Sequence, residues 1–471
     1  MSREHIHFVT GRLAQHALEE ILQEISVDAG FDFSIDVLPI TVAALMTPEW
    51  IAKHINVPSA ASRVLVPGYC PAELEALQSV VAVPIARGPK DYRELPEFFS
   101  LAPLESDYGR WDIEIIAEIN NCPQLTLAEI QQTATALVQD GADVIDIGCE
   151  PDGCWSEVGD AVRALTAQGY RVSIDSLNPW EIELAVRAGA ELVLSVNSSN
   201  REAAADWGVE VVAIPDDPTD ADRSLDETVD LLAQAGVPLR IDPVLEPIGF
   251  GFAQSLGRYL DVRRRYPDAE LMMGIGNLTE LSEVDSAGVN LLLLGYCQEL
   301  AIRSVLTTQV INWTRSSVRE CCAARQLVFH AVNRRVLPKH LDPSLVMLRD
   351  EKVLEADQEE IARLADAVRD ANYRVFASGG EVHLVSRGLH LHDADPFVVM
   401  EQLRQSGPER GLPKNLDASH AFYLGYEMCQ AYTASLLGKT YRQDESLDWG
   451  LATGEQPRHY LHHRRGEDAQ A

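Results

Sequence analysis

Short runs of apolar residues, each ended by an Asp or Asn, recur through the middle of the chain. Four of them are Ala142–Asp146, Arg171–Asp175, Leu192–Asn197 and Leu239–Asp242. Strands of a parallel sheet are covered on both faces, so they read as continuous Val, Ile and Leu runs. A polar side chain at the carboxyl end of such a strand points to the edge where ligands bind. The pattern therefore predicts a parallel sheet with carboxylates and amides at its binding edge.

Eight such strands alternating with helices are predicted between residues 111 and 335. The strands are expected at Ile113–Asn120, Ala142–Gly148, Arg171–Ser176, Leu192–Asn197, Glu210–Pro215, Pro238–Pro243, Glu270–Asn277 and Leu291–Gly295. Eight even β/α units match a (β/α)8 TIM barrel. An open doubly wound sheet is the structural alternative, but the chain has no Gly-x-Gly-x-x-Gly fingerprint after a strand, which favours the closed barrel.

Two smaller domains are expected on either side of the barrel. Residues 1–105 alternate strand and helix patterns and predict an N-terminal α/β layer domain of unknown role. Residues 340–455 combine helices at Asp357–Asp370 and His420–Leu437 with strands at Tyr373–Ala377 and Val382–Ser386, which predicts a C-terminal α+β domain. The polar stretch 456–471 is expected to be a disordered tail.

Composition narrows the classes of partner. The chain has 39 basic and 72 acidic residues, a net charge of −33, which would repel a nucleic acid backbone. No apolar run reaches the roughly 18 residues of a membrane span, and the amino terminus lacks a secretory signal, so a cytoplasmic protein is expected. The eight cysteines form no Cys-x-x-Cys pair and are interpreted as free thiols.

The polar strand ends form the candidate site. Residues two apart on a strand share a face, so five side chains are expected to converge at the mouth of the barrel: Asn120, Asp146, Asp175, Asn197 and Asp242. One layer deeper, Arg240 is expected to pair with a carboxylate inside the barrel, with Glu118 as the first candidate. An unpaired buried guanidinium would be very costly.

Carboxylates and amides in one cup suit a particular kind of ligand. Carboxylates accept from N–H groups and an Asn both donates and accepts, so the set fits the edge of a flat heterocycle such as a pterin. A divalent metal is also compatible with these oxygen ligands. Alternatively, each residue could cap its own loop, as Asp and Asn commonly do. Five such residues at matching positions favour the binding site.

At this point the chain resembles a known family. The segments Glu118-Ile-Asn-Asn-Cys-Pro123, Gly141-Ala-Asp-Val-Ile-Asp-Ile-Gly-Cys-Glu150, Val172-Ser-Ile-Asp-Ser176, Leu194-Ser-Val-Asn197 and Ile241-Asp-Pro243 are similar, in order and spacing, to the pterin-binding barrel of dihydropteroate synthases. The segments Met272–Leu281, Asp285–Asn290 and Tyr423–Glu427 look like the three-part relatives associated with tetrahydromethanopterin synthesis.

The resemblance implies a transferase. It would condense 6-hydroxymethyl-7,8-dihydropterin diphosphate with an arylamine, a ribofuranosyl-aminobenzene phosphate in the relatives, and release pyrophosphate. Pterin contacts would come from Asp175, Asn197, Asp242 and Asp146, with Asp146 and Asp242 as the catalytic carboxylates. Asn120 would help to hold Mg²⁺. Small molecules would be the partners, and a homodimer is expected by analogy with the family.

The chain also departs from the folate-pathway pattern. Gly276-Asn277-Leu278 replaces the family's Ser-Arg-Lys, Gly295-Tyr296-Cys297 stands where an Arg-x-His is expected, and Asn121–Leu125 is shorter than the family's flap. Two alternatives therefore stay open. One is a methyltetrahydropterin-dependent methyltransferase, although no corrinoid-binding Asp-x-His-x-x-Gly is present. The other is a pterin-binding protein without catalysis.

Overall fold

The structure is a computed structural model that describes residues 3–71, 73–102, 108–151, 153–217, 221–346, 348–350, 352–406 and 416–449. The chain divides into two compact units. The first contains residues 1–112 and 325–342, and the second contains residues 113–324 and 343–471. The predicted tail at 456–471 lies outside the described residues.

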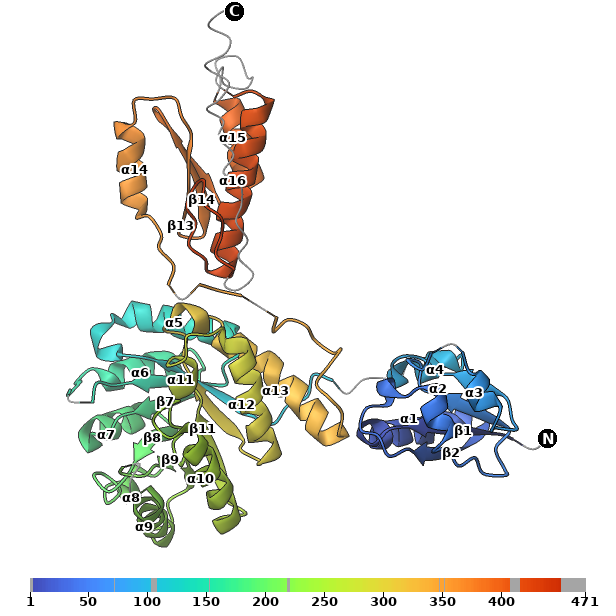
Figure 1. Ribbon diagram of the computed structural model, residues 1–471. Coiled ribbons are helices and arrows are strands. Elements are labelled where there is room, and N and C mark those ends of the chain that lie inside the picture. The colour runs from blue at the N-terminus through green and yellow to red at the C-terminus, as the bar shows by residue number, and fades with distance from the viewer. Residues whose placement is uncertain are drawn as a thin grey trace, which may run out of the picture. The chain divides into compact units, whose positions relative to one another are not determined.

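The second unit contains a closed barrel of eight parallel strands (Figure 1). Around the barrel the order is β10-β11-β12-β5-β6-β7-β8-β9. The strands are β5 (Glu114–Ile119), β6 (Val144–Gly148), β7 (Val172–Asp175), β8 (Leu192–Val196), β9 (Glu210–Ala213), β10 (Leu239–Ile241), β11 (Glu270–Gly274) and β12 (Ser304–Thr307). This confirms the predicted (β/α)8 fold.

Helices follow the strands on the outside of the barrel. They are α5 (Leu127–Gln139), α6 (Val158–Thr166), α7 (Pro179–Ala188), α8 (Ala204–Trp207), α9 (Ala221–Gln234), α10 (Phe252–Arg265), α11 (Gly276–Thr279), α12 (Ser286–Glu299) and α13 (Ser317–Arg334). The start of α5 shows how the sequence sets a boundary. Thr126 and Glu129 form a capping box, in which each side chain accepts from the other residue's backbone N–H, and this satisfies two amides of the first turn.

The eighth strand was wrongly placed by the sequence pattern. Residues 291–295 lie inside α12, and the eighth strand is β12, which begins thirteen residues after Leu291. A short apolar run does not by itself distinguish a buried strand from a buried helix. The burial decides it, because Asn290, Leu293, Leu294 and Cys297 are buried at helical spacing while Leu292 is 76% exposed.

An apolar layer fills the middle of the barrel. It consists of Ile116, Val144, Leu192, Leu194, Val212 and Met272, with Ile214 and Leu306 packed against it. These residues come from six different strands and their ends, so the interior is a packed core and not a channel. Charged side chains of the same inward-facing rows are therefore confined to the two ends of the barrel.

The first unit is built on a separate parallel sheet of order β2-β1-β3-β4. Its strands are β1 (Glu4–Thr10), β2 (Phe31–Val37), β3 (Arg63–Val66) and β4 (Ile85–Arg87), and its helices are α1 (Gln15–Ala29), α2 (Pro48–Ala52), α3 (Glu75–Gln78) and α4 (Leu95–Phe98). Separate apolar clusters cover the two faces, one around Ile6, Phe8 and Leu22 and the other around Val64 and Ile51.

The first unit also has a cavity of about 990 Å³. Thr10, Gly68 and Lys90, which follow or end β1, β3 and β4, contribute to its wall, together with Arg334 and Lys339. The position agrees with the general rule that open α/β sheets bind ligands beyond the carboxyl ends of their strands. Acidic residues such as Glu24 and Glu97 line it as well, so the lining does not select a ligand of one charge.

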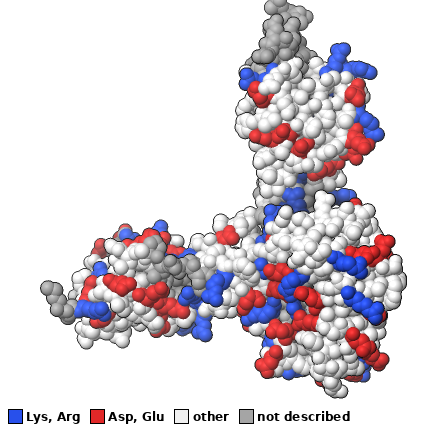
Figure 2. All heavy atoms as spheres, turned by 180° about the vertical axis from the view of Figure 1, so that it is seen from behind, with Lys and Arg blue, Asp and Glu red and all other residues white. Residues whose placement is uncertain are grey.

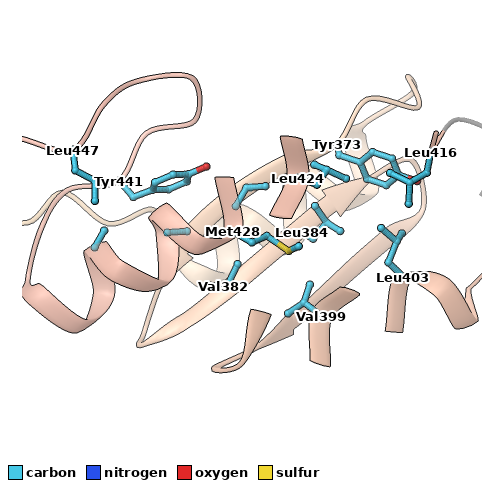
Figure 3. Packing of buried hydrophobic residues seen from close by; sticks show 13 residues of the cluster. Tyr373, Val382, Leu384, Val399, Leu403, Leu416, Leu424, Met428, Tyr441 and Leu447 are labelled. Atoms are coloured by element: carbon cyan, nitrogen blue, oxygen red, sulfur yellow. The ribbon is translucent and has the colours of Figure 1, made fainter. Parts of the chain in front are cut away.

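The second unit also contains a three-stranded antiparallel sheet. Its strands are β13 (Arg374–Ser378), β14 (Glu381–Ser386) and β15 (Leu389–Asp393), and its helices are α14 (Gln358–Ala367), α15 (Pro396–Gln405) and α16 (Ala418–Leu437). Val382 and Leu384 pack against Val399, Leu424 and Met428 of α15 and α16 (Figure 3). This face of the sheet is therefore fixed by a continuous apolar core.

Among the described residues, no helix combines the length and the apolar character that crossing a membrane requires.

Candidate functional site

Three carboxylates meet inside the barrel towards the carboxyl ends of the strands. Glu118 of β5, Asp146 of β6 and Asp175 of β7 each offer an oxygen, and these oxygens all lie within 4.8 Å of one another. We call this group the carboxylate cluster. The expected convergence is thus observed for Asp146 and Asp175, and Glu118 joins them.

The strand register brings the cluster together. Glu118 lies beside Asp146 in the pairing of β5 with β6, and Asp146 lies beside Ser173 in the pairing of β6 with β7. Ser173 Oγ donates to Asp146 Oδ1 at 2.6 Å. Gly148 ends β6 next to this pair, and a Cβ there would lie 2.5 Å from Glu118 Oε1. Gly148 therefore provides the room in which the Glu118 carboxylate lies.

An irregularity in β8 orients the third carboxylate. The pairing of β8 with β9 shifts between Val193 and Val196, and Ser195 has a left-handed backbone with φ 74°. A non-glycine residue seldom adopts this conformation. In this position Ser195 Oγ donates to Asp175 Oδ1 at 2.8 Å. The bulge thus places a hydroxyl where it supports Asp175, as bulges beside active sites commonly re-aim a side chain.

Burial and mutual repulsion make the cluster reluctant to ionise. Burial raises the pKa of Glu118 to about 8, assisted by the charges of Asp175 and Glu280. Burial also raises the pKa of Asp146 well above its usual value, with further contributions from Asp175 and Glu118, and burial raises the pKa of Asp175. A ligand that brings N–H donors or positive charge would remove this penalty.

Two oxygens in this region have no partner in the structure. They are Asp146 Oδ2 and Asn120 Oδ1, both buried and both without a hydrogen bond. Asn120 directly follows β5, two residues after Glu118. Buried polar atoms are nearly always satisfied, so unpartnered oxygens beside a carboxylate cluster fit either an N–H-rich ligand or a hard divalent cation such as Mg²⁺.

Asp242 follows β10 at the same end of the barrel and is held by three donors. Oδ1 accepts from Tyr259 Oη at 2.5 Å and from the Val244 N–H at 2.8 Å, and Oδ2 accepts from the Gly274 N–H at 3.2 Å. Burial raises the pKa of Asp242 to about 6, and the Tyr259 hydroxyl acts in the opposite direction. Asp242 is therefore mainly a fixed anion at neutral pH.

The loop after Asp242 is strained. Val244 has φ 67°, which is a real outlier for a β-branched residue. Arg258 holds the loop by donating to the Pro243 and Val244 carbonyls at 2.8 and 2.7 Å. Strain of this kind persists only where surrounding contacts enforce it, and it is typical of functional sites.

Asn197 follows β8 and is partly engaged by its own turn. Its Oδ1 accepts from the Ser199 N–H at 3.0 Å and from Ser199 Oγ at 2.7 Å. This is the loop-capping role considered as an alternative for such residues. The atom with which Asn197 could bind a ligand is consequently the donor Nδ2, and not the oxygen.

The expected pairing of Arg240 is right in kind but wrong in partner. Arg240 donates to Glu114 at 2.5 Å and to Glu210 at 2.9 Å, both within the barrel rows, and does not pair with Glu118. Glu114 and Glu210 begin β5 and β9, so the contact lies at the amino-terminal end of the barrel. Arg171 joins Glu114 there at 2.5 Å.

Two participants were not assigned these roles from the sequence. The sequence pattern predicts Glu118 as a counter-ion for Arg240 and gives no indication of Tyr259. Glu118 had a usable signal, because it shares its strand parity with Asn120 at the predicted mouth. Tyr259 lies on α10, seventeen residues after Asp242, and no local pattern connects the two.

Charge at long range gives an anionic substrate no assistance. On the face shown in Figure 2, acidic and basic side chains are interspersed over the described residues and do not gather into a broad basic surface. With a net charge of −33, the protein must bind any anionic substrate by local contacts.

Comparison with known proteins identifies the class to which the barrel belongs. Residues 121–282 match the family model of pterin-binding enzymes, and residues 4–90 match a family of unknown function. Together with the closed barrel, the first match shows that residues 121–282 are similar to pterin-binding enzymes, which confirms the pterin-binding part of the resemblance.

Relatives were found both along the whole chain and for the barrel. An uncharacterized protein of Methanocaldococcus jannaschii is 23% identical over 530 residues, covering 94% of this chain and 98% of the relative. Dihydropteroate synthases of Yersinia pestis, in complex with a sulfonamide drug, and of Xanthomonas albilineans, in complex with 7,8-dihydropteroate, are 21% and 22% identical. They cover 49% and 47% of this chain and 97% and 93% of their own, with TM-scores of 0.38 and 0.37. Values this low carry no functional argument.

Proposed function

We propose that the barrel condenses 6-hydroxymethyl-7,8-dihydropterin diphosphate with an arylamine and releases pyrophosphate, in the synthesis of tetrahydromethanopterin or a related pterin cofactor. The arylamine is a ribofuranosyl-aminobenzene phosphate. The observation that carries the proposal is the carboxylate cluster at the mouth of a pterin-type barrel, where buried oxygens of Asp146 and Asn120 lack partners.

The pterin edge supplies the N–H groups that these oxygens need. In the proposal Asp175 and Asp242 accept from ring and amino N–H groups, and Asn197 donates through Nδ2. The Tyr259 and backbone hydrogen bonds hold Asp242 in place before the ligand arrives, so little ordering is required on binding. Asp146 is fully buried, and the proposal places it next to the reacting part of the pterin.

The reaction breaks one bond and forms another at the exocyclic carbon. The C–O bond to pyrophosphate breaks with both electrons leaving on oxygen, the arylamine nitrogen forms the C–N bond, and the amine proton passes to solvent or to pyrophosphate. Positive charge that develops on the pterin is stabilised by the fixed carboxylates of Asp146 and Asp242. A neutral arylamine is already nucleophilic, so the proposal assigns no general base.

Magnesium, when bound, would neutralise charge on the leaving pyrophosphate. Asn120 is the residue proposed to hold it, because its buried Oδ1 has no protein partner and amide oxygens are ligands that hard cations accept. The seventh strand is followed by Gly276 and Asn277, so the pyrophosphate receives no lysine from this position and depends more strongly on the cation.

The direct test is a product assay. Purified protein, Mg²⁺ and the pterin diphosphate are incubated with p-aminobenzoate or with the ribofuranosyl-aminobenzene phosphate, and the conjugate is sought by mass spectrometry. We expect a conjugate with the ribosylated amine. Pterin binding without a conjugate from either amine would instead identify a binding protein, and methyl transfer from a methyltetrahydropterin to a corrinoid would identify a methyltransferase.

Substitutions locate the activity in the barrel. Asp175→Asn and Asp242→Asn should each weaken pterin binding by on the order of 100-fold, because a charged acceptor for N–H groups is lost. Asn120→Ala should reduce Mg²⁺-dependent turnover while leaving pterin binding in place. Asp160→Ala, an exposed carboxylate on α6, is the control. Unchanged turnover in all three site variants would show that the site is elsewhere.

A further inference from the structure

The C-terminal sheet carries a second group of metal-ligating side chains, unconnected with the barrel site. Three histidines lie on one face of the hairpin formed by β14 and β15. His383 is directly opposite His392 in the strand pairing, and His390 is two residues from His392 on the same strand. Their ring centroids are 5.1 to 5.4 Å apart. We call this group the histidine face.

Packing on the opposite face of the same sheet fixes the strands that carry these rings. Val382 and Leu384, the neighbours of His383 in the chain, point into the apolar core with α15 and α16 (Figure 3). Since side chains alternate along a strand, His383 points to the other side, where Val385 packs against Ile361 and Ala365 of α14. The backbone of the hairpin that carries the three imidazoles is therefore fixed by packing on both faces of the sheet.

Outer hydrogen bonds orient two of the rings. His383 Nε2 lies 3.2 Å from the Ser378 carbonyl, and His392 Nδ1 lies 2.8 Å from Glu381 Oε2. A carbonyl and a carboxylate only accept, so in each neutral ring the proton lies on the contacting nitrogen and the other nitrogen carries a lone pair. Metal-binding histidines are typically held in this way by an outer carbonyl or carboxylate.

The inner nitrogens are close to the spacing of a shared metal. His383 Nδ1 and His390 Nε2 are 3.1 Å apart, and two nitrogens bound to one tetrahedral zinc at 2.0–2.1 Å would be separated by about 3.3–3.4 Å. A neutral His390 ring has one N–H, which can donate to His383 Nδ1. The lone pair on His392 Nε2 therefore receives no hydrogen bond from the other two histidines.

From this geometry we propose that His383, His390 and His392 bind a Zn²⁺-type divalent transition-metal ion through His383 Nδ1, His390 Nε2 and His392 Nε2. Imidazole nitrogens favour zinc, copper, nickel and iron over magnesium or calcium. In the structure, no choice of one nitrogen from each ring brings all three nitrogens within 4.8 Å of one another. Coordination thus requires His392, whose side chain is 50% exposed, to swing towards the other two. The proposal is independent of the reaction proposed for the barrel.

The test uses the full-length chain with His459, His462 and His463 replaced by Ala, so that these three histidines cannot bind the metal ion. The protein is stripped with a chelator, and Mg²⁺ is kept in excess to occupy oxygen sites. Co²⁺ is then titrated at pH 7.5, with its visible absorption as the readout and Zn²⁺ as the competitor. We expect one Co²⁺ per chain, with intense absorption of low-coordinate geometry, displaced by Zn²⁺.

Variants identify the ligands. His390→Ala and His392→Ala should each weaken Co²⁺ binding by about tenfold or more, and Glu381→Gln should weaken it less while keeping the absorption spectrum, as an outer partner would. His16→Ala is the matched control, because His16 is also a surface histidine beside a carboxylate, Glu20. Circular dichroism checks that the sheet is intact. Absence of Co²⁺ binding, or equal binding by the parent and both ligand variants, would overturn the proposal.

Discussion

The two ends of the barrel carry charged residues in the same inward-facing rows but treat them in opposite ways. At the amino-terminal end, Arg240 and Arg171 pair with Glu114. Burial alone would raise the pKa of Glu114, but the bonds from these arginines outweigh it and the pKa is lowered. At the other end, three carboxylates face one another and the pKa of each is raised.

At the amino-terminal end the charges of the carboxylates are compensated by arginines of the same chain. At the other end the described residues supply no such compensation, and a ligand would have to provide it. Ile116 lies between Glu114 and Glu118 on β5 and belongs to the apolar layer, so the two groups do not neutralise each other directly. The amino-terminal network contributes to stability, whereas the carboxylate cluster costs stability until something positive or rich in N–H groups occupies it. Perturbed pKa values of this kind are characteristic of functional sites.

The largest expected effect comes from removing Arg240 from the ion pairs at the amino-terminal end of the barrel. Arg240→Ala removes an ion pair from both Glu114 and Glu210, and only Glu114 keeps a second arginine, Arg171. The Arg240 side chain is only 13% exposed. We expect the free energy of unfolding to fall by about 3–5 kcal/mol, as for other buried pairs that lose one partner. Urea denaturation measures the change.

The control for this prediction is an exposed pair on α10. Arg264 and Asp261 contact each other at 2.9 Å with side chains 74% and 63% exposed, so Arg264→Ala should change the free energy of unfolding by less than about 1 kcal/mol. Equal losses in the two variants would contradict the stabilising role of the amino-terminal network.

An intermediate effect is expected from removing one ionisable group from the carboxylate cluster. The folded-state pKa of Glu118, about 8, lies above the 4.5 of an unperturbed glutamate. Its contribution to stability is therefore present below pH 4.5 and is lost as the pH rises towards 8. Glu118→Gln, which cannot ionise, should flatten this decline and make the protein more stable than the parent at pH 8 by on the order of 1–3 kcal/mol.

The measurement is chemical denaturation in chelator at pH 5, 6, 7 and 8, repeated with Mg²⁺. If the cluster binds a cation, the parent should regain stability with Mg²⁺ at pH 8 and the variant should regain less. Parallel stability curves for parent and variant in chelator would show that Glu118 does not titrate as described.

The smallest effect is expected at Tyr259. Its hydroxyl donates to Asp242 and lowers the pKa of that carboxyl, so Tyr259→Phe should raise the pKa of Asp242 above 6 and cost about 1 kcal/mol of stability. Pterin affinity should fall a few-fold near pH 6 and recover by pH 8. Calorimetric titrations from pH 5.5 to 8 would reveal a shift of the midpoint, and an unchanged midpoint would show that Tyr259 only supports the fold.

The sequence predicted most of the barrel because a buried parallel strand leaves a strong local pattern. Seven of the expected strands overlap observed ones. The eighth failed because the Leu291–Leu294 run is equally compatible with a buried helix. The position that corresponds to the family's basic motif near the eighth strand consequently follows β12, where this chain has Thr308-Gln309-Val310.

The depth of each side chain could not be predicted in the same way. Strand parity correctly put Glu118 and Arg240 in inward rows, but the tilt and stagger of strands in a closed barrel decide which residues meet. Arg240 consequently lies with Glu114 at one end, and Glu118 with Asp146 and Asp175 at the other. The contact from Tyr259 and the bulge at Ser195 depend on tertiary structure that no local pattern encodes.

Gly148 makes two distant positions of the chain interdependent. Any side chain larger than hydrogen at this point would occupy the space of the Glu118 carboxylate. A larger residue at 148 would therefore require the side chain of residue 118 to turn away or to be shorter, and either change would leave two carboxylates at the mouth. Across related sequences, the pair of residues at 118 and 148 should thus distinguish barrels with three acids at the mouth from barrels with two.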